Sequence, residues 1–130
     1  MSKKVVLVGH CGPDSSYLRM AVSRASKGIS VLSADDQDDL SKVLTKDTPD
    51  LLLLNRELPY GFEVTFGVDL IRALRPKFPN LAMMLVSNYP EAQAEALQAG
   101  AVQGFGKREI GSPRVGELIR NALGETSPVS

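Results

Sequence analysis

Polar side chains follow several short apolar runs of this sequence, and their types decide what chemistry the chain can do. The run Leu51–Leu54 is followed by Asn55 and has breaker residues on both sides, which is typical of a strand buried on both faces of a parallel sheet. Ligands bind outside the carboxyl ends of such strands, so Asn55 places an amide where a reactive group would stand. The other residues expected to line this crevice are Gly9, His10, Ser87 and Lys107.

These side chains suit hydrogen bonding better than catalysis. The simplest interpretation of Asn55 is an amide that satisfies backbone groups at a strand end. An anion, if one binds, is expected between Lys107 and the N-terminus of the first helix. His10 is the only histidine, and Cys11 beside it does not complete a metal-binding set, so we expect a loop histidine, no metal and no cofactor.

The overall composition is that of an ordinary globular domain. The 130 residues suit one domain, which we place at residues 1–124 with a frayed polar tail at 125–130. Fifteen basic and fifteen acidic residues cancel, which argues against nucleic acid or an anionic membrane as the main partner. The single cysteine excludes an internal disulfide and favours a reducing cytoplasm. The apolar run Val5–Val8 is far too short to span a membrane.

Strand and helix patterns alternate five times, which predicts a parallel sheet sandwiched between helices. At this length, right-handed crossovers favour a flavodoxin-like α/β fold with five helices and a five-stranded sheet in the order 2-1-3-4-5. The expected strands are Val5–Val8, Ile29–Leu32, Leu51–Leu54, Leu81–Val86 and Ala101–Gly106. The expected helices run from Asp14 or Ser15 to Gly28, from Asp35 through Leu44, and over Val68–Arg75, Glu91–Ala99 and Pro113–Leu123.

Several local features are specific enough to test. Asp14 or Ser15 is expected to cap the first helix, whose apolar face should include Tyr17. The second strand is less apolar than the others and is expected near an edge of the sheet. Ser112 is expected to cap the last helix. The long connection 59–67 carries three aromatic residues and is expected to fold back onto the domain.

Three stretches, in this order and spacing, resemble the receiver domain of bacterial two-component response regulators, the CheY family. They are Leu51–Pro59, Gly67–Arg75 and Val86–Lys107, and the resemblance covers nearly the whole chain. It implies an acidic pair after the first strand that helps to hold Mg²⁺, and a phosphoryl-accepting aspartate after the third. It also implies a Ser or Thr after the fourth strand and a Lys after the fifth.

The chain departs from this family pattern at the positions that carry the chemistry. The acidic pair falls on Gly9 and His10, and the acceptor falls on Asn55, whereas Ser87 and Lys107 match. An amide nitrogen is no nucleophile, and Mg²⁺ prefers a site with carboxylates among its oxygen ligands. The position of the family's aromatic switch residue falls on a glycine, Gly104, and the usual proline after the lysine is an arginine. These departures predict a degenerate receiver, or pseudo-receiver, that is no enzyme.

The resemblance therefore predicts a signalling module that binds another protein or domain of a bacterial pathway, or a second copy of itself. The family's usual partner face, formed by the fourth helix, fifth strand and fifth helix, here carries Tyr89, Gln93, Gln98, Gln103, Phe105, Arg108, Arg114 and Glu117. A second candidate surface is the aromatic connection with Tyr60, Phe62 and Phe66.

Two alternatives remain open at this point. One is a flavodoxin-like domain that binds an anion or a nucleotide with the loop after the first strand. The other is a receiver that is phosphorylated at a different acid, such as Glu57.

Overall fold

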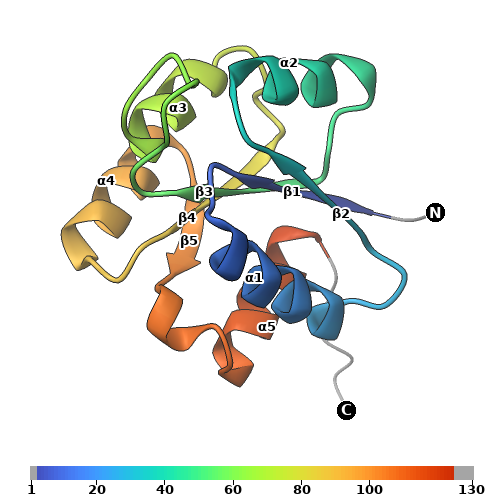
Figure 1. Ribbon diagram of the computed structural model, residues 1–130. Coiled ribbons are helices and arrows are strands. Elements are labelled where there is room, and N and C mark those ends of the chain that lie inside the picture. The colour runs from blue at the N-terminus through green and yellow to red at the C-terminus, as the bar shows by residue number, and fades with distance from the viewer. Residues whose placement is uncertain (1–2, 125–130) are drawn as a thin grey trace.

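Five parallel strands form one sheet in the order β2-β1-β3-β4-β5, as the sequence predicts. The structure, a computed structural model, describes residues 3–124 (Figure 1). The strands are β1 (Lys4–Val8), β2 (Ser30–Ala34), β3 (Leu51–Asn55), β4 (Ala82–Val86) and β5 (Val102–Phe105). The helices are α1 (Gly12–Ala25), α2 (Gln37–Lys46), α3 (Gly67–Leu74), α4 (Pro90–Ala99) and α5 (Pro113–Ala122), with a short 3-10 helix η1 (Lys107–Glu109) after β5.

The sheet is covered on both faces, which explains the unbroken apolar run of β3. Helices α2, α3 and α4 lie on one face, and α1 and α5 lie on the other (Figure 1). Leu52 and Leu54 belong to the first core cluster, and Leu51 and Leu53 to the second. All four side chains are fully buried, and each contributes on the order of 2 kcal/mol through the hydrophobic effect.

The first helix begins earlier than its sequence suggests. Cys11 is the N-cap of α1 and Pro13 lies in its first turn, so the prediction of a cap at Asp14 or Ser15 is wrong. Proline is favoured in a first turn because its missing N–H has no partner there. Tyr17 is 61% exposed, which contradicts its predicted place on the apolar face. The buried stripe is formed by Leu18, Ala21, Val22 and Ala25.

The second strand lies at one edge of the sheet, as predicted, but it begins one residue later and ends two residues later than expected. It pairs with β1 from Lys4↔Ser30 to Val8↔Ala34, and the burial of Ala34 fixes this register. At the last helix, Ser112 is the N-cap residue, but its side chain makes no cap hydrogen bond. The predicted position of the cap is therefore confirmed, and the helix begins at Pro113.

The aromatic connection folds back onto the domain, as expected. The Leu58 N–H donates to the Thr65 carbonyl at 2.7 Å, and the Gln37 N–H at the start of α2 donates to the Gly61 carbonyl at 2.9 Å. Phe62 packs against the core cluster. These contacts hold the connection against α2.

Arg75, the C-cap residue of α3, joins the end of this helix to the α3–β4 connection and to Gly100 at the end of α4. Its guanidinium donates to four backbone carbonyls at 2.8 to 3.2 Å. The acceptors belong to Phe78, Pro79, Leu81 and Gly100. Within residues 3–124, no helix is long and apolar enough to cross a membrane.

Candidate functional site

A cleft of about 260 Å³ lies at the carboxyl ends of the central strands. It brings together Asn55, Ser87 and Lys107, three of the five residues predicted to line the crevice. Its lining also includes Arg56, Glu57, Val86, Asn88 and Tyr89. Gly9 lies instead against the Leu58 and Pro59 side chains, where its positive φ of 72° suits a glycine.

The amide of Asn55 ties the ends of two strands together. Its Nδ2 donates to the Gly9 carbonyl at 3.1 Å and to the Glu57 carbonyl at 3.0 Å, and its Oδ1 accepts from the Arg56 N–H at 3.1 Å. Both ends of the amide are therefore engaged by backbone groups, and a carboxylate could not make the two donor contacts.

His10 lies in the loop between β1 and α1, as predicted, and its side chain is buried. Its Nε2 lies 2.9 Å from the Leu53 carbonyl. Since a carbonyl only accepts, Nε2 carries the proton of the neutral ring. Burial is the main cause that lowers the pKa of His10 to about 4, and the bond to Leu53 opposes it only in part. The ring is therefore neutral at pH 7, and its Nδ1 is buried without a hydrogen-bond partner.

Lys107 is paired with a carboxylate that the sequence analysis did not place in the site. Its Nζ lies 2.7 Å from Oδ2 of Asp14, in the first turn of α1. The hydrogen bond from Lys107 holds the pKa of Asp14 below its usual value, and partial burial opposes this. This ion pair neutralises the charge of the ammonium group that the sequence analysis assigns to an anion.

The β4–α4 connection, residues 87–89, closes the other side of the cleft. Ser87 Oγ accepts from the Tyr89 N–H at 3.1 Å, and Asn88 Oδ1 accepts from the Arg108 N–H at 3.1 Å. The Arg56 guanidinium lies 4.9 Å from the centre of the Tyr89 ring, a cation–π arrangement. This connection is thus held to both neighbouring segments of the chain.

The three positions at which the resemblance places the Mg²⁺ ligands carry no carboxylate. Gly9 supplies no side chain, His10 is buried against a carbonyl, and Asn55 supplies one neutral oxygen. Octahedral Mg²⁺ sites use carboxylates and water. Within the described part of the chain, no group of three or more His, Cys, Asp or Glu residues is placed to hold a metal ion.

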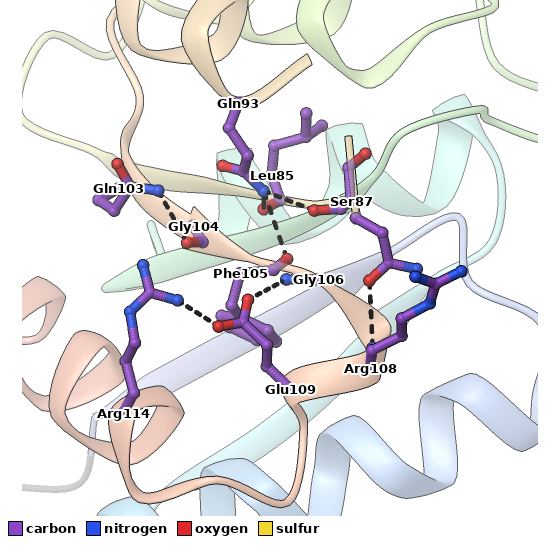
Figure 2. Close-up of polar contacts among 11 residues, drawn as sticks. Leu85, Ser87, Gln93, Gln103, Gly104, Phe105, Gly106, Arg108, Glu109 and Arg114 are labelled. Atoms are coloured by element: carbon purple, nitrogen blue, oxygen red, sulfur yellow. Dashed lines mark hydrogen bonds and ion pairs between the residues drawn. The ribbon is translucent and has the colours of Figure 1, made fainter. Parts of the chain in front are cut away.

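The predicted partner residues near α4, β5 and α5 lie around a second cleft, of about 530 Å³. We call this surface the α4–β5–α5 face; it includes Leu97, Gln103, Arg108 and Arg114. Arg114 pairs with Glu109 at 2.5 Å (Figure 2). Two predicted members of the face line this cleft, but their side chains are not free to meet a partner. Phe105 is only 1% exposed and belongs to the core, and the partly buried Gln93 amide donates to backbone carbonyls.

The aromatic connection exposes less apolar surface than expected. Tyr60 is fully exposed, and Phe66 is 43% exposed. Phe62 is half-buried and packs against the core. One ring therefore anchors the connection, and the other two are accessible.

Sequence reasoning missed Asp14, Asn88 and Glu109 as parts of the site. Asp14 could have been found, because the first turn of a helix after β1 must lie next to the ends of β3 and β5 in this strand order. The hydrogen bonds of Asn88 and Glu109 to neighbouring backbone depend on local loop geometry, which leaves no periodic signal.

The fold of this chain is similar to solved structures, whereas its sequence matches no protein family. No family model matches the chain, and no curated protein matches it in sequence. It is similar to NtrX from Brucella abortus, with a TM-score of 0.76, 20% identity and 95% of this chain covered. It is also similar to the RcsB response regulator of Salmonella typhimurium, with a TM-score of 0.76, 17% identity and 98% coverage.

The receiver domain of the stress response regulator RcsB from Escherichia coli matches nearly end to end. The TM-score is 0.76 at 16% identity, and 97% of each chain is covered. By contrast, this chain spans 27% of the NtrX chain and 64% of the Salmonella RcsB chain. The fold is therefore that of CheY-like response regulator receiver domains. In this chain, Asn55 lies at the end of β3, and Lys107 pairs with Asp14.

Proposed function

We propose that this chain is a degenerate receiver domain that acts in signal transduction by binding another protein or domain, without aspartyl-phosphate chemistry. The carrying observation is the hydrogen bonding of Asn55, which stands where the resemblance places the phosphoacceptor. Its amide nitrogen is committed to the carbonyls of Gly9 and Glu57. An amide does not supply the carboxylate nucleophile that phosphoryl transfer to a receiver requires.

The charges around the cleft support the same proposal. Phosphoryl transfer depends on cations that neutralise the developing charge. The only lysine of the cleft lies 2.7 Å from the Asp14 carboxylate, and the carboxylates that would hold Mg²⁺ are absent at Gly9 and His10. An incoming phosphoryl group would have to displace Asp14 before it could reach Lys107.

The proposed docking surface is the α4–β5–α5 face. It combines an exposed apolar side chain, Leu97, with two exposed arginines, Arg108 and Arg114, around a cleft of about 530 Å³. Apolar contacts with arginine anchors are typical of protein interfaces. The partner is another signalling protein, a linked domain or a second copy of this chain.

The test is a titration with Mg²⁺ and beryllofluoride, a phosphoryl mimic, followed by amide NMR shifts. We expect no saturable shifts at millimolar ligand around Asn55, Ser87 and Lys107. An Asp14→Asn variant serves as a sensitised control, because it frees the lysine. Saturable Mg²⁺-dependent shifts in the unaltered protein would refute the proposal.

The same spectra separate the alternatives. Inorganic phosphate that shifts the Gly9–Gly12 amides without Mg²⁺ would favour the anion-binding alternative. Mg²⁺-dependent shifts centred on Glu57 would favour a receiver phosphorylated at that acid. Glu57 is 64% exposed and lies 3.5 Å from Arg56, so we expect neither.

A further inference from the structure

Gly104 in β5 and Gly106 directly after this strand leave room for side chains of the segment 88–93. A Cβ atom on Gly104 would lie 2.1 Å from the Leu85 carbonyl oxygen and 2.8 Å from Gln93 Oε1. A Cβ on Gly106 would lie 2.1 Å from Asn88 Oδ1. Because side chains alternate along a strand, both glycines face the same way, and Phe105 between them points into the core.

The Gln93 side chain occupies the space above Gly104 (Figure 2). Its Nε2 donates to the carbonyls of Leu85 at 3.0 Å, Ser87 at 3.1 Å and Phe105 at 3.3 Å. The pairing of β4 with β5 shifts register between Met84 and Val86. A single amide of α4 therefore supplies a donor to both strands where their regular pairing is interrupted.

Asn88 makes the second connection, above Gly106. Its Oδ1 accepts from the Arg108 N–H at 3.1 Å, so the start of the β4–α4 connection is joined to η1. The Gly106 N–H in turn donates to Glu109 Oε2 at 2.9 Å (Figure 2). Two side chains thus join the segment 87–93 to the chain at 104–108, and both need a glycine beneath them.

We propose that Gln93 and Asn88, seated above Gly104 and Gly106, lock α4 and its preceding connection onto β5. The lock holds the α4–β5–α5 face in one conformation, so partner binding at this face needs no activating modification. This inference rests on the proposed function, since it specifies how the docking face of that module is regulated.

The physical reason is the cost of withdrawing Gln93. If α4 moved away from β5, the partly buried Leu85 and Ser87 carbonyls would lose the Gln93 donor, and the Phe105 carbonyl would keep only the Ser87 N–H. Motion of α4 alone would therefore be as rare as opening of the neighbouring strands. Without the Gln93 amide, α4 can open separately from the sheet.

Amide hydrogen exchange of a Gln93→Ala variant tests the lock, with Gln98→Ala as the matched control. Gln98 is an exposed residue of the same helix. We expect exchange of the α4 amides to rise at least tenfold in Gln93→Ala relative to those of β1 and β3. Gln98→Ala should exchange like the unaltered protein. Unchanged α4 exchange in Gln93→Ala, or an equal rise over the whole chain, would overturn the proposal.

A second measurement uses smaller changes, in case Gln93→Ala does not fold. NMR relaxation dispersion of the unaltered protein should show no microsecond-to-millisecond exchange in residues 85–106, and Asn88→Ala should introduce it in residues 87–93. Exchange already present in the unaltered protein would refute the lock. The beryllofluoride titration is independent of both results, so failure of the lock and failure of the proposed function can be told apart.

Discussion

Acidification from pH 7 to pH 5 should destabilise this fold mainly through one side chain, His10. Burial lowers its pKa from 6.5 to about 4, so the folded chain binds the ring proton less readily than the unfolded chain. The loss of unfolding free energy caused by His10 is negligible well above pH 6.5 and grows as the pH falls. It reaches its full value below the pKa of the ring in the folded protein. The whole shift is worth about 3 kcal/mol, and linkage places about 2 kcal/mol of it between pH 7 and pH 5.

The assay is the free energy of urea unfolding at pH 7 and pH 5, compared between the unaltered protein and His10→Gln. Glutamine can still donate to the Leu53 carbonyl but does not titrate. We expect the unaltered protein to lose about 2 kcal/mol more than the variant over this range. The carboxylates with lowered pKa values, such as Asp14 and Glu109, are present in both proteins, and their effect cancels.

The single histidine also allows a direct check. The chain contains one His, so its ring resonance in the NMR spectrum needs no assignment by mutation. A ring that titrates near 6.5 in the folded protein would refute the reasoning. Equal stability losses in both proteins between pH 7 and pH 5 would refute it as well.

Three further substitutions test other parts of the structure by urea unfolding. Arg75→Lys should lower the free energy of unfolding by about 2 to 3 kcal/mol, because lysine cannot reach the four carbonyls that the guanidinium joins. A loss below about 0.5 kcal/mol would mean that these four hydrogen bonds do not stabilise the fold. Gly67→Ala should cost at least about 2 kcal/mol, because the new Cβ would lie 2.3 Å from the Asn55 carbonyl oxygen, whereas Gly111→Ala, with nothing within 4 Å, should be nearly neutral. Asp14→Asn should change stability by less than about 1 kcal/mol, because both partners are partly exposed. A larger loss would mean that the ion pair supports the fold itself.

The sequence predicts the layers of this fold better than it predicts the site. The apolar runs of β1, β3 and β4 identify buried strands, because burial on both faces requires an unbroken run. The ends of β5 and α1 are harder to predict. A four-residue strand with one glycine inside it and another just after it carries little pattern, so the sequence wrongly places Phe105 on the surface. Tyr17 was misplaced for a related reason: it lies beside the buried stripe of α1, where the periodicity is ambiguous.

The site itself depends on contacts between distant parts of the chain. The burial of His10 follows from the position of the Leu53 carbonyl on the neighbouring strand. The Lys107–Asp14 pair joins η1 to the first turn of α1. Neither contact has a local sequence signal. The residue types at the strand ends were readable from the sequence, whereas their partners required the structure.

Side chains cover backbone groups of both edge strands, which limits the ways in which the proposed partner could bind. At the β2 edge, Arg19 donates to the Val31 carbonyl at 2.6 Å and to Ser33 Oγ at 3.1 Å. At the β5 edge, Gln103 Nε2 donates to the Gly104 carbonyl at 3.0 Å, and Glu109 accepts from the Gly106 N–H. Side chains thus occupy backbone groups that an added strand would need, a common way to prevent edge-to-edge pairing.

A partner of this domain is therefore expected to dock through side chains and not by extending the sheet. On the α4–β5–α5 face, the accessible anchors are Leu97 on α4 and Arg108 on η1. Contacts of this kind need α4 and β5 to keep a fixed relative position, because a partner that bridges them must meet both at once. The Gln93 amide, which joins α4 to both β4 and β5, supplies that fixed geometry.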